Sequence, residues 1–160
     1  MEEGRARMTL AIAIPEQPSA ADQQLLLQAL EAHNDRAAGP DPAQALAVLL
    51  RDEGQTLGGL WGWTFWRWLF VGILIVPEGL RGRGWGSRIL RQAEAQAAAR
   101  GCHAAWLDSF SFQAPGFYEK QGYRLFATLE DYPPGHRRCF FEKRLDRSLA
   151  RQAQQENGTT

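Results

Sequence analysis

Residues 76–88 read "VPEGLRGRGWGSR", a run in which three glycines alternate with large side chains and three arginines recur. Glycine loses more conformational entropy on folding than any other residue, so three glycines this close together need a structural reason. An apolar segment, "WLFVGILIV", precedes the run, and the alanine-rich segment 85–100 follows it with helical spacing of its apolar residues. The pattern predicts a loop between a buried strand and a helix.

Such a loop is chemically suited to a pyrophosphate group. The first turn of a helix exposes unpaired N–H groups and carries partial positive charge. Small residues let phosphate oxygens approach that backbone, and arginine adds charged, bidentate donors. The alternative from the loop alone is a glycine-rich turn with solvated arginines.

Three phosphate-binding loops have distinct spacings. A P-loop needs Gly-Lys-Ser/Thr, and this run holds no lysine. The dinucleotide fingerprint G-x-G-x-x-G places Ser87 where the third glycine is required. The spacing Arg-x-x-Gly-x-Gly fits directly, with Arg81, Gly84 and Gly86.

The rest of the chain predicts a mixed α/β protein with short antiparallel parts, in the order β-α-β-β-β-α-β-α-β-β. Ser19 is the expected N-cap of the first helix, Gly101 ends the second, and the third strand of the central meander is expected to be deeply buried. The expected strands are 9–14, 45–52, 56–65, 68–76, 103–110, 123–130 and 137–145, and the expected helices are 19–34, 85–100 and 114–121.

Composition excludes several classes of protein. The 160 residues suit a single domain with a real core, and 18 basic against 18 acidic residues leave no basic field for nucleic acid. The longest apolar run is about half of the ~20 residues of a membrane helix, and the N-terminus lacks the pattern of a secretory signal. Cys102 and Cys139 share no metal or redox spacing, so we expect buried, reduced thiols, no metal and a cytoplasmic location.

A second block, "FYEKQGY" at residues 117–123, follows the glycine run. Together with "LIV" at 74–76 and "LRGRGWGSRIL", it makes the sequence resemble the GNAT superfamily of N-acetyltransferases. Residues 107–145 further resemble a bacterial subgroup of small GNAT proteins. The likeness is strong over 68–145 and weak before about 45. It implies a mostly antiparallel central sheet flanked by helices, in one acetyltransferase domain at 9–145. Residues 1–8 are expected to be flexible, and 146–160 flexible or marginally helical.

The resemblance also implies a co-substrate, acetyl-coenzyme A, and residues that bind it. A backbone N–H in the segment Leu74, Ile75 and Val76 would polarise the acetyl carbonyl. Tyr118 would be the general acid toward the leaving thiolate. Ser111 stands where the family often has an asparagine that binds the pantetheine arm, and Gln113 is the alternative donor. The pyrophosphate would be wrapped by the backbone of Arg81, Gly82, Arg83, Gly84, Trp85, Gly86 and Ser87.

Deprotonation of an amine acceptor needs a base, and the sequence offers several carboxylates. We favour Asp108, acting directly or through water; the alternative is that it caps a strand end. Glu78, Glu130, Asp131 and His136 are the other candidates. Trp61, Trp63, Trp66 and Trp68 concentrate in two strands, either as packing or as an acceptor wall or dimer contact.

We therefore expect an N-acetyltransferase that moves an acetyl group from acetyl-coenzyme A to the primary amine of a small molecule or peptide. The alternatives are a coenzyme A-binding regulatory or interaction domain without catalysis, and a nucleotide-binding module. No nucleic acid or membrane partner is expected, and a homodimer is possible. No motif in residues 19–42 or in the last hairpin indicates the acceptor.

Overall fold

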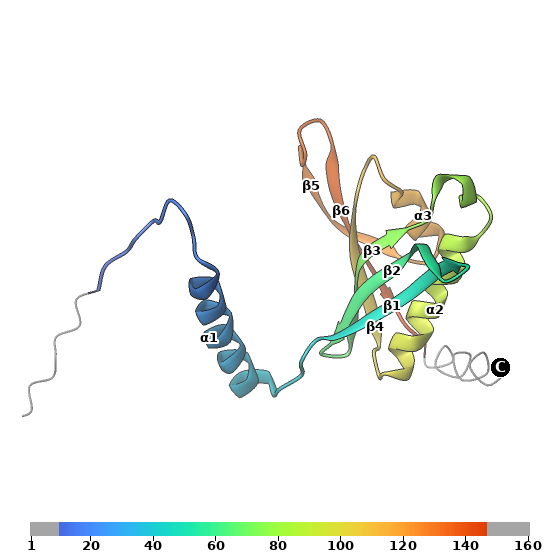
Figure 1. Cartoon of the computed structure of the whole chain (residues 1–160). Coiled ribbons are helices and arrows are strands. Elements are labelled where there is room, and N and C mark those ends of the chain that lie inside the picture. The colour runs from blue at the N-terminus through green and yellow to red at the C-terminus, as the bar shows by residue number, and fades with distance from the viewer. Residues whose placement is uncertain (1–9, 147–160) are drawn as a thin grey trace, which may run out of the picture. The chain divides into compact units, whose positions relative to one another are not determined.

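The computed structural model describes residues 10–146 and divides the chain into two compact units, Met1–Pro40 and Asp41–Thr160 (Figure 1). The expected flexible start, 1–8, and residues 147–160 of the expected tail lie outside the described residues. Each unit is described by itself.

The first unit contains α1, Ala20–Ala38. Its N-cap is Ser19, as predicted, and the Ser19 hydroxyl accepts a hydrogen bond from the Asp22 N–H at 3.0 Å. The helix continues four residues past the expected end, because the first helix-breaking residue is Gly39, which has a φ of +82°.

The predicted strand 9–14 is wrong over its described part, since residues 10–14 form no regular secondary structure. Leu10, Ile12 and Ile14 alternate with alanines, which is why the segment resembles a strand. All three are at least 87% exposed, and the sheet contains no strand from this segment. Alternation alone does not make a strand, because its backbone groups also need a paired neighbour.

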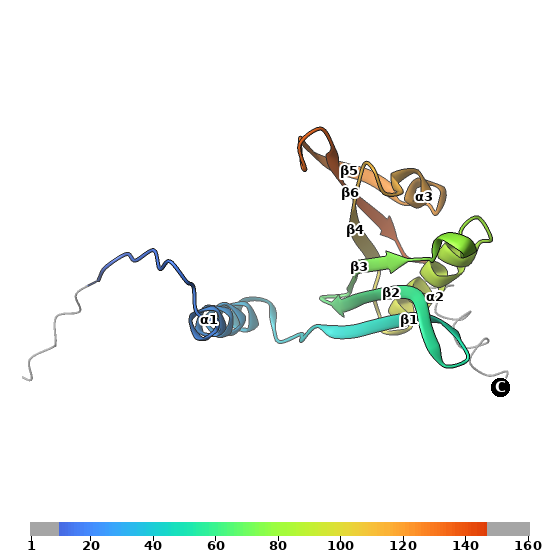
Figure 2. The ribbon, with the colours of Figure 1, turned by 45° about the horizontal axis from the view of Figure 1, so that its top comes forward.

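The second unit is built on one six-stranded sheet in the order β1-β2-β3-β4-β6-β5 (Figures 1 and 2). All neighbours are antiparallel except β3 and β4. This mixed, mostly antiparallel sheet with helices confirms the expected fold class. The strands are β1 Gln44–Asp52, β2 Gln55–Phe65, β3 Trp68–Ile75, β4 Ala104–Phe110, β5 Arg124–Glu130 and β6 Arg137–Arg144, and the helices are α2 Trp85–Ala99 and α3 Pro115–Lys120.

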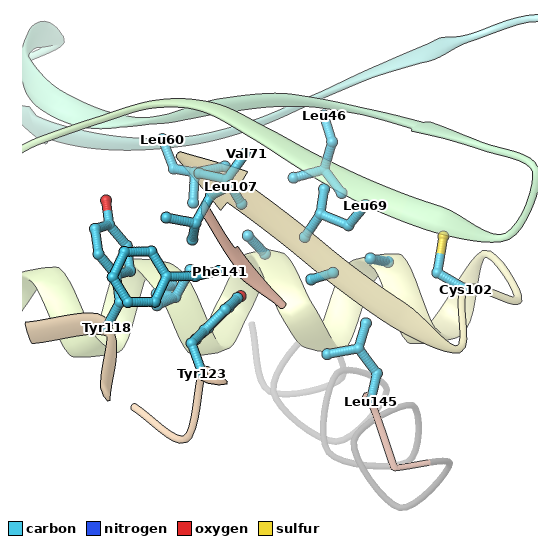
Figure 3. Close-up of a cluster of buried hydrophobic side chains, with 14 of the residues drawn as sticks. Leu46, Leu60, Leu69, Val71, Cys102, Leu107, Tyr118, Tyr123, Phe141 and Leu145 are labelled. Carbon is cyan, nitrogen blue, oxygen red and sulfur yellow. The ribbon is translucent and has the colours of Figure 1, made fainter. Parts of the chain in front are cut away.

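One face of the sheet packs on α2 (Figure 3). The helix buries the stripe that its spacing predicts and ends at Ala99. The predicted stop, Gly101, follows the C-cap, and its N–H donates to the Ala98 carbonyl. The sheet side of this core includes Leu46, Leu60 and Leu69, each at most 2% exposed. From α2 come Ile89, Leu90, Ala93 and Ala97.

The other face of the sheet carries a row of aromatic rings. Trp63 stacks on Phe70 with ring centroids 5.9 Å apart, and Phe70 stacks on Trp106 at 4.3 Å. This agrees with the packing interpretation for Trp63, whereas Trp61 is 42% exposed. The expectation that β3 is deeply buried is wrong for its second half, because Ile73 and Ile75 are more than half exposed.

A charged pair lies inside the core beneath α2. Glu94 is 1% exposed, and its carboxylate accepts a hydrogen bond from the Lys143 ammonium at 2.7 Å. The Tyr123 hydroxyl is buried beside the same carboxylate, and burial together with the charge of Glu94 raises the pKa of Tyr123 well above its usual value. The two cysteines are buried and unpaired, as predicted. Within the described residues, no helix has the length and apolar character needed to cross a membrane.

Candidate active site

The two parallel strands at the centre of the sheet separate halfway along. β3 pairs with β4 only from Trp68 to Val71, opposite Ala104 to Leu107. At that point Gly72 forms a bulge, because Val71 and Ile73 face consecutive residues of β2. A bulge bends its strand, and here it turns β3 away from β4. Among the described residues, the remaining inner edges of both strands have no strand partner, and the two strands diverge (Figure 2). We call the place where their backbones diverge the splayed opening.

The glycine run forms the loop that leads from β3 into α2. Gly82 and Gly84 have φ of +72° and +80°, the left-handed conformation that explains two of the three glycines. Gly84 is the N-cap of α2 and gives its first N–H groups no side-chain acceptor. A Cβ at Gly82 or Gly84 would meet no atom within 4 Å, so the space around the loop is open. The first N–H groups of α2 therefore have no side-chain cap from Gly84, which is the arrangement that anion-binding loops use, and coenzyme binding there stays a prediction.

Two exposed arginines make contacts within this loop. The Arg81 Nε donates a hydrogen bond to the Val76 carbonyl at 3.0 Å, which ties the middle of the loop to its first residue. The Arg88 guanidinium lies 4.4 Å from the centre of the Trp85 ring. Their positive charge stays beside the helix N-terminus, where it adds to the attraction for an anion.

The third glycine has a different role, which is to let two sequence blocks meet. A Cβ on Gly86 would lie 3.4 Å from the Phe117 ring and 3.8 Å from Val76. Phe117 belongs to "FYEKQGY", so α3 packs directly on the glycine loop. The two motifs, which are about thirty residues apart in the sequence, therefore lie against each other.

Tyr118 follows Phe117 and is 9% exposed, with its ring 5.9 Å from Phe141 and 6.0 Å from Tyr123 (Figure 3). Burial is the main cause that raises the pKa of Tyr118 to about 12, and the negative charge of Asp108 adds to it. At neutral pH this side chain is therefore a protonated phenol that can donate a hydrogen bond.

Asp108 lies on β4 just past the last residue paired with β3. Its Oδ2 accepts a hydrogen bond from the Arg138 Nε at 2.8 Å, and its side chain is 17% exposed. The guanidinium of Arg138 also donates to the Tyr132 hydroxyl at 3.2 Å and lies over the rings of Phe110, Tyr132 and Phe140. The favoured base is thus partly buried and ion-paired.

Ser111 and Gln113 both have hydrogen bonds within the chain. The Ser111 hydroxyl accepts from the Arg137 N–H at 3.1 Å, and the Gln113 side-chain oxygen accepts from the Phe110 N–H at 2.8 Å. These bonds fix the connection between β4 and α3. A contact of either side chain with pantetheine stays a prediction.

The other candidate bases are all exposed. In the sequence, each is farther from the residues where the β3–β4 pairing ends than Asp108 is, which directly follows Leu107. Glu78 is in a short 3-10 turn of the glycine loop, Glu78–Leu80. Asp131 accepts a hydrogen bond from the Gly135 N–H within the β5–β6 turn, and the His136 ring rests edge-on against Phe112 at 4.9 Å. The charge of Asp108, by contrast, contributes to the raised pKa of Tyr118.

Sequence reasoning missed Arg138 and the rings around it. The signal was the alternation in "RRCFFEK", which puts Arg138 and Phe140 on one face of a strand. This alternation alone was not sufficient, because only the pairing register of β6 with β4 brings the Arg138 face of β6 next to Asp108.

Comparison with known proteins agrees with this geometry. Residues 10–123 match the acetyltransferase (GNAT) family. Over 85 residues, 52% of this chain, the sequence is 48% identical to blasticidin-S acetyltransferase from Streptomyces morookaense, and that stretch spans only 62% of the relative. An acetyltransferase structure from Bacillus cereus superposes with a TM-score of 0.75 at 35% identity, over 83% of this chain and 98% of the other.

A more distant structure shares the fold alone. It is an aminoglycoside 6′-N-acetyltransferase complexed with coenzyme A, with a TM-score of 0.55 and 17% identity, over 64% of this chain and 73% of the other. The protein is an acetyltransferase of mixed α/β fold. It belongs to the GNAT family.

Proposed function

We propose that the protein is an N-acetyltransferase that transfers an acetyl group from acetyl-coenzyme A to the primary amine of a small molecule. The observation that carries this proposal is the end of β3–β4 pairing at Val71 and Leu107, next to an open glycine loop. A pyrophosphate fits the helix N-terminus, and an extended thioester arm fits the unpaired strand edges. The Streptomyces relative is named for blasticidin S, a small molecule, and this supports a small acceptor for the present protein.

The backbone would hold the thioester and polarise it. The N–H groups of Arg81 to Ser87 would bind the pyrophosphate, and an N–H of Leu74, Ile75 or Val76 would donate to the acetyl carbonyl oxygen. The side chains of Leu74 and Val76 pack on the core, which fixes the backbone that carries these donors.

Asp108 and Tyr118 would act from opposite sides of the splayed opening. On β4, Leu107 and Ser109 face the core, as Tyr118 does, whereas Asp108 faces the other side. The acceptor amine would approach on the Asp108 side and lose a proton to that carboxylate or to a water beside it. The C–N bond then forms, the C–S bond breaks, and the sulfur leaves on the Tyr118 side.

The high pKa of Tyr118 defines how it would assist the leaving sulfur. A phenol with a pKa of about 12 is a secure hydrogen-bond donor, but an ordinary thiolate has a conjugate-acid pKa of about 8.5. Full proton transfer is therefore uphill by more than three pKa units unless the enclosed thiolate becomes more basic. We assign Tyr118 first to stabilising the developing thiolate by a hydrogen bond, and to delivering the proton once enclosure has made the thiolate more basic.

Two measurements test the proposal. Acetyl-coenzyme A and coenzyme A should raise the melting temperature and NAD should not; a larger shift with NAD would contradict the site. A panel of amines that includes blasticidin S and lysine peptides should then show thiol release with small amines. Coenzyme binding without release from any amine would favour the non-catalytic alternative.

Tyr118→Phe tests the mechanism. We expect kcat to fall at least about tenfold with coenzyme affinity nearly unchanged, because the ring packing stays and only the donor is lost. Tyr123→Phe is the matched control, since it removes a hydroxyl from the same buried cluster, where the charge that acts on it is that of Glu94 rather than Asp108. Equal kcat in the two variants would exclude the role of Tyr118.

A further inference from the structure

Four rings gather where β4 ends and the β5–β6 turn begins, and we call them the ring platform: Phe110, Phe112, Tyr132 and His136. Phe110 and Phe112 stack with centroids 5.3 Å apart and an interplanar angle of 2°. Tyr132 meets Phe110 edge-on, and His136 meets Phe112 edge-on. Phe112 is 56% exposed and Tyr132 46% exposed, so the platform presents aromatic surface to solvent.

The platform is held in place by the backbone beneath it. The Ser111 N–H donates to the Arg137 carbonyl at 2.8 Å, and the Arg137 N–H donates back to the Ser111 hydroxyl. These two bonds attach the loop that carries Phe112 to the first residue of β6. Rings fixed in this way lose little entropy when a ligand binds.

Arg138 gives the platform its charge preference. Its guanidinium lies 5.4 Å from the ring centres of both Phe110 and Tyr132, and it is held there by Asp108 and by the Tyr132 hydroxyl. Phe110 and Tyr132 therefore already face a cation on one side. A second cationic group stacked on them would be repelled, whereas a flat uncharged ring would not.

The platform adjoins the point at which the acceptor amine would react. Asp108 and Phe110 are two residues apart on the same face of β4, and a strand rises about 3.3 Å per residue. The carboxylate and the first ring are thus separated by about 7 Å along the strand. An amine beside Asp108 with a ring two or three carbons away spans that distance.

We propose that the ring platform binds a flat, uncharged ring of the acceptor and so selects amines that carry such a ring two to three carbons from the nitrogen. This inference rests on the proposed N-acetyltransferase function. It concerns only the acceptor, since the glycine loop and Tyr118 have no part in it.

Three amines of similar size test the selection in a thiol-release assay. We expect kcat/KM for 2-phenylethylamine to exceed that for 2-cyclohexylethylamine and hexylamine by about tenfold, because only the flat ring can stack. Phe112→Leu should remove this preference while changing hexylamine turnover less than about twofold. Phe126→Leu is the control, as Phe126 is 48% exposed on β5 outside the platform.

A binding measurement separates this inference from the proposed function. Saturation-transfer NMR with 2-phenylethanol, which has no amine, should show contact with the protein and lose it in Phe112→Leu. Contact without any acetyl transfer would support the platform and contradict the function. Turnover of all three amines at equal rates, with no 2-phenylethanol contact, would overturn the platform and leave the function standing.

Discussion

Gly84 meets two requirements of the glycine loop, a positive φ and open space beside the backbone. Its φ of +80° is the conformation that most side chains avoid, and the space beside it is where a phosphate would lie. Asparagine tolerates this φ better than other residues, so Gly84→Asn should fold. We expect calorimetry to show coenzyme A affinity weakened at least about tenfold, because the new side chain enters the phosphate position.

Gly101→Asn is the control for this variant. Gly101 follows the other end of α2, has a φ of +90°, and would also place a Cβ in open space. We expect a similar small loss of melting temperature but unchanged coenzyme affinity. Equal weakening in both variants would show that the effect at Gly84 is one of helix stability rather than of phosphate access.

For single residues, the sequence predicted where the backbone needs glycine, but it did not predict which side chains pair with each other. The positive φ of Gly82 and Gly84 follows from a glycine spacing that can be read directly. The pairing of Asp108 with Arg138 joins residues thirty apart, and it depends on how β6 aligns with β4. That alignment results from packing of the whole sheet, which local patterns do not contain.

The turn between β2 and β3 has none of the glycine, asparagine or aspartate residues that usually mark such a turn in a sequence. Trp66 and Arg67 have φ of 43° and 61°, a pair of values that type I′ hairpin turns need and that Asn-Gly normally supplies. The Trp66 N–H donates to the Asp41 carboxylate, and the Arg67 carbonyl accepts from the His103 N–H at 2.9 Å. These bonds hold a turn that its own residues disfavour.

Arg67→Gly should therefore stabilise the protein. Glycine adopts the required φ without the steric cost, and we expect about 0.5 to 1 kcal/mol more stability in urea unfolding. Arg51→Gly, at an exposed position of the edge strand β1 without a positive φ, is the control and should destabilise, because glycine costs more backbone entropy and relieves no strain there. A loss of stability in Arg67→Gly would mean that the Arg67 bond to the Gly101 carbonyl outweighs the strain.

The buried Glu94 carboxylate of α2 is paired with the Lys143 ammonium of β6. Lys143→Met would leave the Glu94 carboxylate without its cation at 1% exposure, which should cost about 3 to 5 kcal/mol. The double variant Glu94→Leu with Lys143→Met should recover most of this loss, because an apolar pair needs no desolvated charge. Urea unfolding at neutral pH measures both; a double variant as unstable as the single one would contradict this account.

At the scale of the whole molecule, the helices and the six observed strands follow from spacing and from glycine and proline positions. The sequence did not reveal where pairing ends. The strand predicted at 9–14 has suitable alternation but no strand partner among the described residues, and β3 loses its parallel partner at the Gly72 bulge. Both features depend on which backbone edges meet, and the second creates the opening on which the candidate site depends.

Folding stability of the whole molecule should fall at alkaline pH because of the buried tyrosines. The pKa of Tyr118 is about 12 and that of Tyr123 is well above 10, so the folded state holds protons that the unfolded chain releases from about pH 10 upward. Stability is therefore fully present below pH 10 and is lost as the pH rises through the folded pKa. For Tyr118 alone we expect about 1 kcal/mol less stability at pH 11 than at pH 9. Urea unfolding at both values should show a smaller difference in the Tyr118→Phe, Tyr123→Phe double variant; an unchanged difference would mean that other groups cause the alkaline loss.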